Sequence, residues 1–275
     1  MTSAARERRS ISFTVLCVLY LIVMLFPVYW MAMMMFKPSD VMFVRPTEWG
    51  FSPTLAHFDY VLEQGFLANL GTSLIVSIGS TLLVVVIGTP AAYAFARFPI
   101  WRRDDLFLFI LATRMAPPVA LAIPFYLIYA KLDLLDTHIG LILVYLTFNL
   151  SFYVWVLRSF CRDLPVELEE AALADGYSRA QVLYKVVLPL LRPGIVSTSV
   201  LCFIFAWNEF LYAFLLGGRS VKTLPVAIPT LITGQGVLWG ELAVVGIVSV
   251  IPVFIVVFYL QRHIIRGLTM GAVKG

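Results

Sequence analysis

Carboxylates gather at the start of one charged stretch, residues 164–193, in an otherwise apolar sequence. The stretch reads LPVELEEAALADGYSRAQVLYKVVLPLLRP. Pro165 suits a first helical position, and Glu167, Glu169 and Glu170 follow in the first turns, where carboxylates interact favourably with the helix dipole. The pattern predicts a short acidic helix, and the chemistry open to it is recognition through charge.

A second short helix is predicted directly after the first. Gly176 is suited to the left-handed turn that ends a helix. Ser178 and Gln181 have the spacing of a capping box, which opens a helix, and Leu188-Pro189 would close it. Two short helices joined at a glycine form an elbow that can protrude and dock on a partner.

Few polar side chains interrupt the long apolar runs of the sequence. Arg114, Asn149, Asn208 and Glu209 are the most informative of them. If these runs lie in a bilayer, a charge near its centre costs about 2.5 to 3.5 kcal/mol. We therefore expect these side chains to face the interior of a bundle or a water-filled cavity.

The sequence lacks the motifs of an ATP-hydrolysing or metal-dependent enzyme. It has no Gly-rich loop ending in Lys-Ser/Thr for phosphate and no metal-ligand spacing. The histidines and cysteines are scattered: His57, His138 and His263, and Cys17, Cys161 and Cys202. Without CxxC spacing we interpret the cysteines as small core residues, and an isolated histidine is usually interfacial.

The composition indicates which solvent surrounds the chain. Hydrophobic residues make up 61% of the 275 residues and charged residues 13%, whereas soluble domains have about 45 to 50% and about 25%. The sequence therefore predicts an integral membrane protein. The net charge of +4 does not indicate nucleic-acid binding, because basic residues of membrane proteins gather on the cytoplasmic side.

Six apolar runs are each close to the roughly 20 residues that cross a bilayer. They lie at about 11–36, 70–95, 106–129, 139–160, 195–216 and 242–260. Pro117, Pro118 and Pro124 should bend the third run and keep it inside a bundle. We predict an all-α integral membrane fold with six transmembrane helices in a single domain, 1–275, with external loops at 37–64 and 217–241.

Basic residues predict the orientation. If the amino terminus is inside, 14 of the 20 Lys and Arg residues fall in cytoplasmic segments and five in external ones. Short loops rich in Lys and Arg stay in the cytoplasm. We therefore expect both termini and the elbow on the cytoplasmic side.

Glu170-Ala171-Ala172, then Gly176, Val186 and finally Leu188-Pro189 keep a fixed spacing between the fourth and fifth predicted spans. In spacing and position this stretch resembles the EAA loop of ATP-binding-cassette (ABC) importer permeases, with Val186 where isoleucine is commoner. Residues 89–97, 206–210 and 261–275 are similar to the second permease subunit of maltose-type, binding-protein-dependent carbohydrate importers. The resemblance implies a type I ABC importer permease fold with a cytoplasmic coupling helix.

In that family the elbow sits in a cleft of an ATPase subunit and transmits its closure to the membrane helices. The resemblance implies that the ATPase-coupling site consists of Glu169, Glu170, Ala171, Ala172, Asp175, Gly176, Leu188 and Pro189. The alternative is a hairpin lying on lipid headgroups. Its acidic first helix disfavours that alternative, because headgroup-binding helices favour Lys and Arg.

The resemblance also implies an assembly. The chain would form half of a translocation pore with a second, homologous permease subunit, and would bind two ATPase subunits, identical or different. An extracytoplasmic solute-binding protein would deliver the carbohydrate, an oligosaccharide, polyol or sugar derivative. The chain itself is expected to bind no cofactor and to be no enzyme, because ATP and Mg would be held by the ATPases. The expected location is the bacterial cytoplasmic (inner) membrane.

Planar hydrogen-bonding groups beside aromatic rings are suited to sugars. The residues expected to line a substrate path are Asn149, Tyr153, Trp207, Asn208 and Glu209. Alternatively, Arg114 and Glu209 form a structural pair or reach subunit contacts, and the partner permease holds most of the substrate contacts.

Two further segments have roles implied by the resemblance. The tip of the 217–241 loop would enter the binding protein's cleft through Thr233, Gly234, Gln235, Gly236 and Trp239; the alternative is a loop that only packs on the bundle. The tail would touch the ATPases through Gly271, Val273, Lys274 and Gly275.

A rival function is that of an ATP-independent secondary transporter or channel-like protein. Such transporters usually carry inverted repeats with helices broken at matched places. We find no internal repeat in this sequence, so the importer permease is the favoured interpretation.

Overall fold

The computed structural model describes residues 3–47 and 49–270, most of which are helical. The chain divides into two compact units, one within 1–67 and 228–251, the other within 68–227 and 252–275. Two long helices, α3 (Phe66–Arg97) and α12 (Trp239–Met270), contribute residues to both units.

The first unit contains α1 (Ser3–Met34), α2 (Ala56–Glu63) and the first turns of α12. The 3₁₀-helix η2 (Ile228–Leu231) and a hairpin of β1 (Ile232–Thr233) and β2 (Gly236–Val237) precede α12. Met34, Met42 and Ala243 form a small core. The side chains of residues 13–29 on α1 are exposed, so the interpretation of Cys17 as a core residue is wrong.

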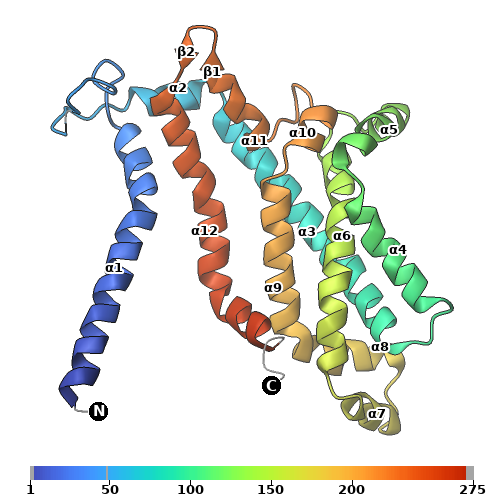
Figure 1. Ribbon diagram of the computed structural model, residues 1–275. Helices are drawn as coiled ribbons and strands as arrows, with labels where there is room; N and C mark the ends of the chain where they lie inside the picture. Colours follow the sequence, from blue (N-terminus) through green and yellow to red (C-terminus); the bar gives the residue numbers. More distant parts are fainter. Residues whose placement is uncertain (1–2, 48, 271–275) are drawn as a thin grey trace. The chain divides into compact units, whose positions relative to one another are not determined.

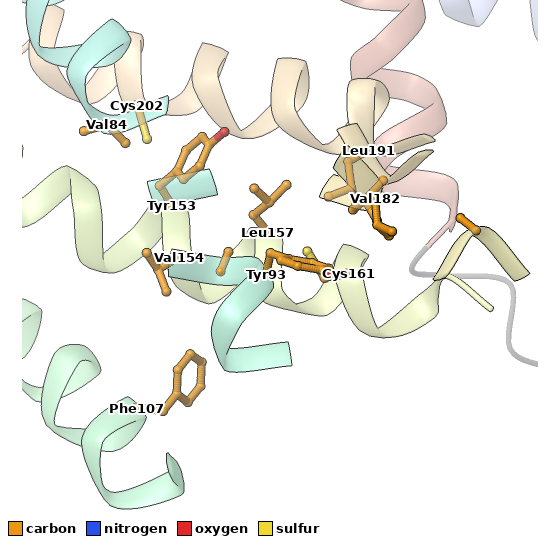
Figure 2. Packing of buried hydrophobic residues seen from close by; sticks show 13 residues of the cluster. Val84, Tyr93, Phe107, Tyr153, Val154, Leu157, Cys161, Val182, Leu191 and Cys202 are labelled. Atoms are coloured by element: carbon orange, nitrogen blue, oxygen red, sulfur yellow. The ribbon is translucent and has the colours of Figure 1, made fainter. Parts of the chain in front are cut away.

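The second unit is a bundle around α6 (His138–Asp163). Against α6 pack α3, α4 (Arg103–Met115) and α9 (Leu188–Trp207) (Figure 1). Shorter helices complete the unit: α5 (Pro118–Lys131), α7 (Glu167–Ala174), α8 (Arg179–Val182), α10 (Leu211–Leu216) and α11 (Leu224–Ala227). Tyr153 and Leu157 of α6 lie at the centre of the core in Figure 2.

Glycines allow α6 to approach its neighbours closely. A Cβ atom on Gly88 of α3 would lie 2.6 Å from the ring of Tyr153, and one on Gly194 of α9 would lie 2.7 Å from the ring of Phe160. Because both rings come from α6, glycine at these positions lets aromatic side chains fill the space between helices.

Within the described residues, five helices are long and apolar enough to cross a membrane, or six if the bent pair α4 and α5 counts as one span. The five are Phe13–Met34, Phe66–Arg97, His138–Asp163, Arg179–Trp207 and Trp239–Gln261. The predicted helical membrane fold is therefore confirmed, with the short β1–β2 hairpin as an addition to it.

The third predicted span is not one bent helix. It consists of α4 and α5, which meet at 93°. Ala116 and Pro117 are both extended, with ψ near 129° and 124°, because proline disfavours the helical region for the residue before it. Two successive prolines, Pro117 and Pro118, impose this restriction twice, which explains why the helix breaks instead of curving.

The fifth predicted span, 195–216, also needs correction. Its helix α9 ends at Trp207 and the chain resumes as α10 at Leu211. The side chain of Asn208 donates to the carbonyl of Ile204, 2.8 Å away. The predicted loop 217–241 is not a plain loop either, since it contains α11, η2 and the β1–β2 hairpin.

Asp136, between α5 and α6, holds the turn that follows α10. Its carboxylate accepts from the backbone N–H groups of Ser220 at 3.1 Å and Val221 at 2.7 Å. Burial alone would raise the pKa of this carboxyl, but the amides that donate to it lower the pKa below its usual value. The ionised carboxylate therefore stabilises this turn.

We expect Asp136→Asn to lower the stability of the folded protein by about 1 kcal/mol at neutral pH, because an amide oxygen replaces only one of two charged acceptors. The contribution of Asp136 is complete above about pH 4 and is lost as the pH falls through its lowered pKa. Thermal unfolding of the detergent-solubilised protein across this pH range measures the difference.

Asp133→Asn is the matched control, because Asp133 (φ 53°) and Asp136 (φ 54°) share a left-handed backbone. A loss of stability as large in the control as in Asp136→Asn would contradict the assigned role.

Candidate functional site

The elbow of α7 and α8 lies at one end of the second unit, beside the end of α6 (Figure 1). Gly176 follows α7 with φ +88°, and a side chain there would be strained. Ser178 accepts from the N–H of Gln181, whose side chain accepts from the N–H of Ser178. The predicted turn and capping box are confirmed.

The second arm of the elbow does not end at Leu188-Pro189 as predicted. The helix continues from α8 through a π-helical turn, Leu183–Val187, into α9, which begins at Leu188. The wide turn ends two residues before Pro189, which cannot donate a backbone hydrogen bond. The elbow therefore joins α9 without a break in helical structure.

One face of the elbow is exposed. Glu170, Ala171 and Asp175 are exposed, and nothing lies within 4 Å of the place where a Cβ on Gly176 would be. This face combines negative charge with small side chains. It can accept close approach by a second molecule that carries donors or positive charge.

Two of the predicted coupling residues lie on the opposite face. Ala172 packs into the core and Glu169 is only 4% exposed. The Glu169 carboxylate accepts from the Tyr93 hydroxyl at 2.7 Å and from Arg97 Nε at 2.6 Å. Glu169 therefore binds the rest of this unit and does not share the exposed face with Glu170.

Sequence reasoning did not single out Tyr93 and Arg97 as partners of the elbow. They stand four residues apart near the end of α3, so they lie on one face of that helix. The available signal was the four-residue spacing of a phenol and a guanidinium close to the end of an apolar run. Nothing in the sequence indicated that Glu169 would be their partner.

A cavity of about 640 Å³ opens inside the bend between α4 and α5. Its polar lining includes Arg114, Glu209, Thr113 and Thr147. The aromatic lining is Phe125, Phe148 and Tyr212. Hydrogen-bonding groups beside aromatic rings can hold a polar solute of small to moderate size.

Most residues expected on a substrate path do not line this cavity. Asn149 is fully buried and donates to the carbonyl of Cys202 on α9. Tyr153 is also fully buried, with its hydroxyl 2.9 Å from that of Thr89 on α3. Trp207 stacks on Phe203 inside the unit. Asn149 and Tyr153 therefore join neighbouring helices, and Trp207 packs against its own helix α9.

Glu209 lines the cavity and also organises the break between α9 and α10. Its carboxylate accepts from the backbone N–H groups of Tyr212 and Ala213, both at 3.1 Å. Its neighbour Asn208 is exposed. In the described part of the chain Glu209 forms no ion pair with Arg114, so the structural pair considered above is not formed.

Arg114 instead contacts backbone and aromatic groups. It donates to the carbonyl of Phe148 at 2.9 Å, and its guanidinium lies 5.0 Å from the ring centroid of Phe152 and 4.9 Å from that of Phe205. Such cation–π contacts allow an arginine to remain charged in apolar surroundings.

The predicted tip of the 217–241 segment is the turn of the hairpin. Thr233 pairs with Gly236, and its hydroxyl donates to the Gly236 carbonyl at 2.8 Å. Gly234 and Gln235 form the exposed turn. Trp239 begins α12 and lies edge-on against Phe43, with centroids 5.7 Å apart. The predicted tail contacts, Gly271, Val273, Lys274 and Gly275, lie outside the described residues.

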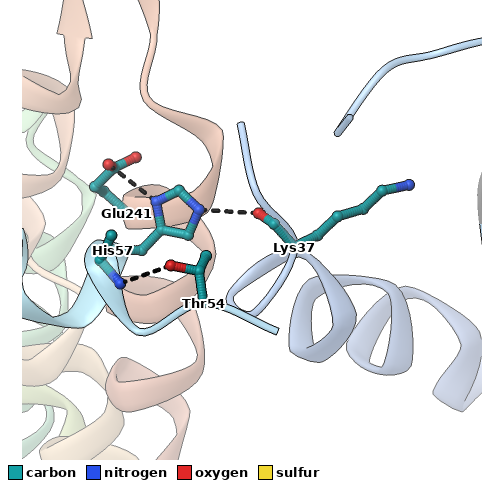
Figure 3. Close-up of polar contacts among 5 residues, drawn as sticks. Lys37, Thr54, His57 and Glu241 are labelled. Atoms are coloured by element: carbon teal, nitrogen blue, oxygen red, sulfur yellow. Dashed lines mark hydrogen bonds and ion pairs between the residues drawn. The ribbon is translucent and has the colours of Figure 1, made fainter. Parts of the chain in front are cut away.

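His57 is not an isolated interfacial histidine. It is buried, with Nδ1 3.1 Å from the Glu241 carboxylate and Nε2 donating to the carbonyl of Lys37 at 3.0 Å (Figure 3). The ring thus joins α2 to the start of α12 and to the segment after α1. Gly240 makes this possible, because a Cβ there would lie 2.4 Å from the ring.

Comparison with known proteins assigns the chain to a family. Residues 84–270 match the model of the binding-protein-dependent transport system inner membrane component. This region contains the elbow and the cavity. The chain belongs to this family.

The relatives and the fold agree with this assignment. The permease is 35% identical to "Probable ABC transporter permease protein y4oR" of Sinorhizobium fredii, over 99% of both chains. It is 37% identical to "Trehalose transport system permease protein SugB" of Mycobacterium tuberculosis, over 98% of this chain and 99% of the relative. A chain of a bacterial ABC transporter that imports alginate has the same fold, with a TM-score of 0.78 at 23% identity, covering 95% of this chain and 98% of the other.

We expect Gly240→Ala to destabilise the permease by about 1 to 3 kcal/mol, because the added methyl group overlaps the His57 ring and forces α2 and α12 apart. Gly234→Ala is the matched control, since nothing lies within 4 Å of a Cβ there. Thermal unfolding in detergent measures both, and equal midpoints would contradict the close packing at His57.

Proposed function

We propose that this permease is the transmembrane subunit of an ATP-driven, binding-protein-dependent importer of a carbohydrate. It forms half of the translocation pore with a second, homologous permease. Two ATPase subunits complete the importer, and one of them binds the elbow of this chain. The ATPases hold the ATP and Mg and perform the hydrolysis, so the chain itself carries out no chemical step. Its place is the bacterial cytoplasmic membrane, with both termini and the elbow inside.

The exposed face of the elbow is the observation that carries the proposal. Glu170, Ala171 and Asp175 are exposed, while the other face is fixed to the bundle through Glu169. An element that is held on one side and free on the other can receive movement from a partner. Closure of the ATPases around ATP would draw the elbows together and open the pore to the outside.

Membership of the permease family and the lining of the cavity support a carbohydrate as the solute. The named solute of the M. tuberculosis relative is trehalose. In this permease, Thr113, Thr147 and Glu209 offer hydrogen-bonding groups beside the rings of Phe148 and Tyr212. Hydroxyl-rich ligands with apolar ring faces suit such a lining. A solute-binding protein would deliver the sugar at the β1–β2 hairpin.

Charge reversal on the exposed face tests the proposal. We expect Glu170→Lys to leave the permease inserted in the membrane but to reduce the amount of ATPase that co-purifies with it about tenfold or more. Placing a charge of the wrong sign in an interface costs several kcal/mol of binding free energy. Gly176→Pro should act similarly, since proline cannot adopt φ +88°. Co-purification of tagged permease with its ATPases from membranes gives the measurement.

Asp59→Lys is the matched control, because Asp59 is an exposed acid on α2, outside the elbow. We expect the Asp59→Lys permease to co-purify with the wild-type amount of ATPase. Normal recovery and normal transport-coupled hydrolysis in both elbow variants would refute the coupling role.

A further inference from the structure

We propose that Glu169 is a positioning residue for coupling, which fixes the elbow to the end of α3 so that α3 moves with it. The inference rests on the proposed function, because it requires that a partner ATPase moves the elbow. It adds a second route into the membrane, since the chain itself joins the elbow only to α6 and α9.

The first step is the geometry of the carboxylate. Both Glu169 oxygens accept hydrogen bonds from α3, one from Tyr93 at 2.7 Å and one from Arg97 Nε at 2.6 Å. The carboxylate is almost completely buried. Charged hydrogen bonds shielded from water are among the stronger contacts in a protein, and salt screens them little.

The second step is the other contact of Arg97. Its terminal nitrogen donates to the carbonyl of Leu164, the residue directly after α6, at 2.7 Å. One guanidinium thus binds both ends of the short linker between α6 and α7. The elbow cannot swing about this linker while the arrangement of Tyr93, Arg97, Leu164 and Glu169 persists.

The third step concerns the other arm. The guanidinium of Arg179, the first residue of α8, lies 5.7 Å from the ring centroid of Phe98, which directly follows α3. The same ring meets Tyr93 edge-on at 5.7 Å. The first arm therefore contacts the last turns of α3 and the second arm contacts Phe98, the residue directly after it, although more than 70 residues separate these contacts in sequence.

The adjacent residues Glu169 and Glu170 thus have different roles. Glu170 is exposed and can meet a partner, whereas Glu169 is buried and bound to α3. A displacement imposed at Glu170 reaches α3 through the neighbouring side chain. Loss of the buried contacts should uncouple the helix from the elbow without removing the docking face.

Purified importer in proteoliposomes, with its ATPases and binding protein, provides the test. Tyr93→Phe removes one donor and keeps the ring, and Glu169→Gln removes the charge and keeps the shape. We expect both variants to assemble with wild-type amounts of ATPase but to transport about tenfold less solute per ATP hydrolysed, the effect of one charged hydrogen bond. The double variant should lose less than the two single losses combined, because both changes act on one contact.

Tyr129→Phe is the control, because it removes a buried tyrosine hydroxyl from α5, away from the elbow. The inference is overturned if complexes of Tyr93→Phe keep the wild-type ratio of solute transported to ATP hydrolysed. This holds even if Glu169→Gln lowers the amount of assembled complex. If no ATPase co-purifies with the wild-type permease, the result contradicts the proposed function and not this inference alone.

Discussion

Backbone polar groups in apolar surroundings must be paired, and this constraint governs the whole chain. It explains why nearly every long segment is helical, and also how the helices are allowed to end. At the bend after α4, Pro117 and Pro118 have no N–H groups to leave unpaired. At the break after α9, Asn208 donates to a carbonyl and Glu209 accepts from two N–H groups. Each interruption is thus compensated locally.

The same constraint separates what sequence could predict from what it could not. Long apolar runs and the capping signals at Gly176 and Ser178 are local, and the structure agrees with them. The end of α9 depends on whether the Glu209 carboxylate caps a new helix. The hydrophobicity of the surrounding sequence does not reveal this. The continuation through Pro189 depends on a π-helical turn, although proline usually signals an end.

The candidate site shows a similar division. Sequence spacing located the elbow, but it could not distinguish Glu169 from Glu170, because burial of one acid is decided by Tyr93 and Arg97 on a distant helix. Asn149 and Tyr153 were chosen as polar groups in apolar runs, and they bind neighbouring helices instead. A polar side chain in such a run needs partners, and other helices can supply them as well as a solute can.

The glycines around α6 affect how its neighbours can move. Aromatic rings of α6 rest on Gly88 of α3 and Gly194 of α9, and Ile142 of α6 rests on Gly79. A side chain of α6 fits at each of these places only because the glycine has no Cβ. Axial sliding of α3 along α6 would bring the Tyr153 ring against residues that carry a Cβ, so this glycine contact and the hydroxyl pair of Thr89 and Tyr153 both set a preferred register for α3.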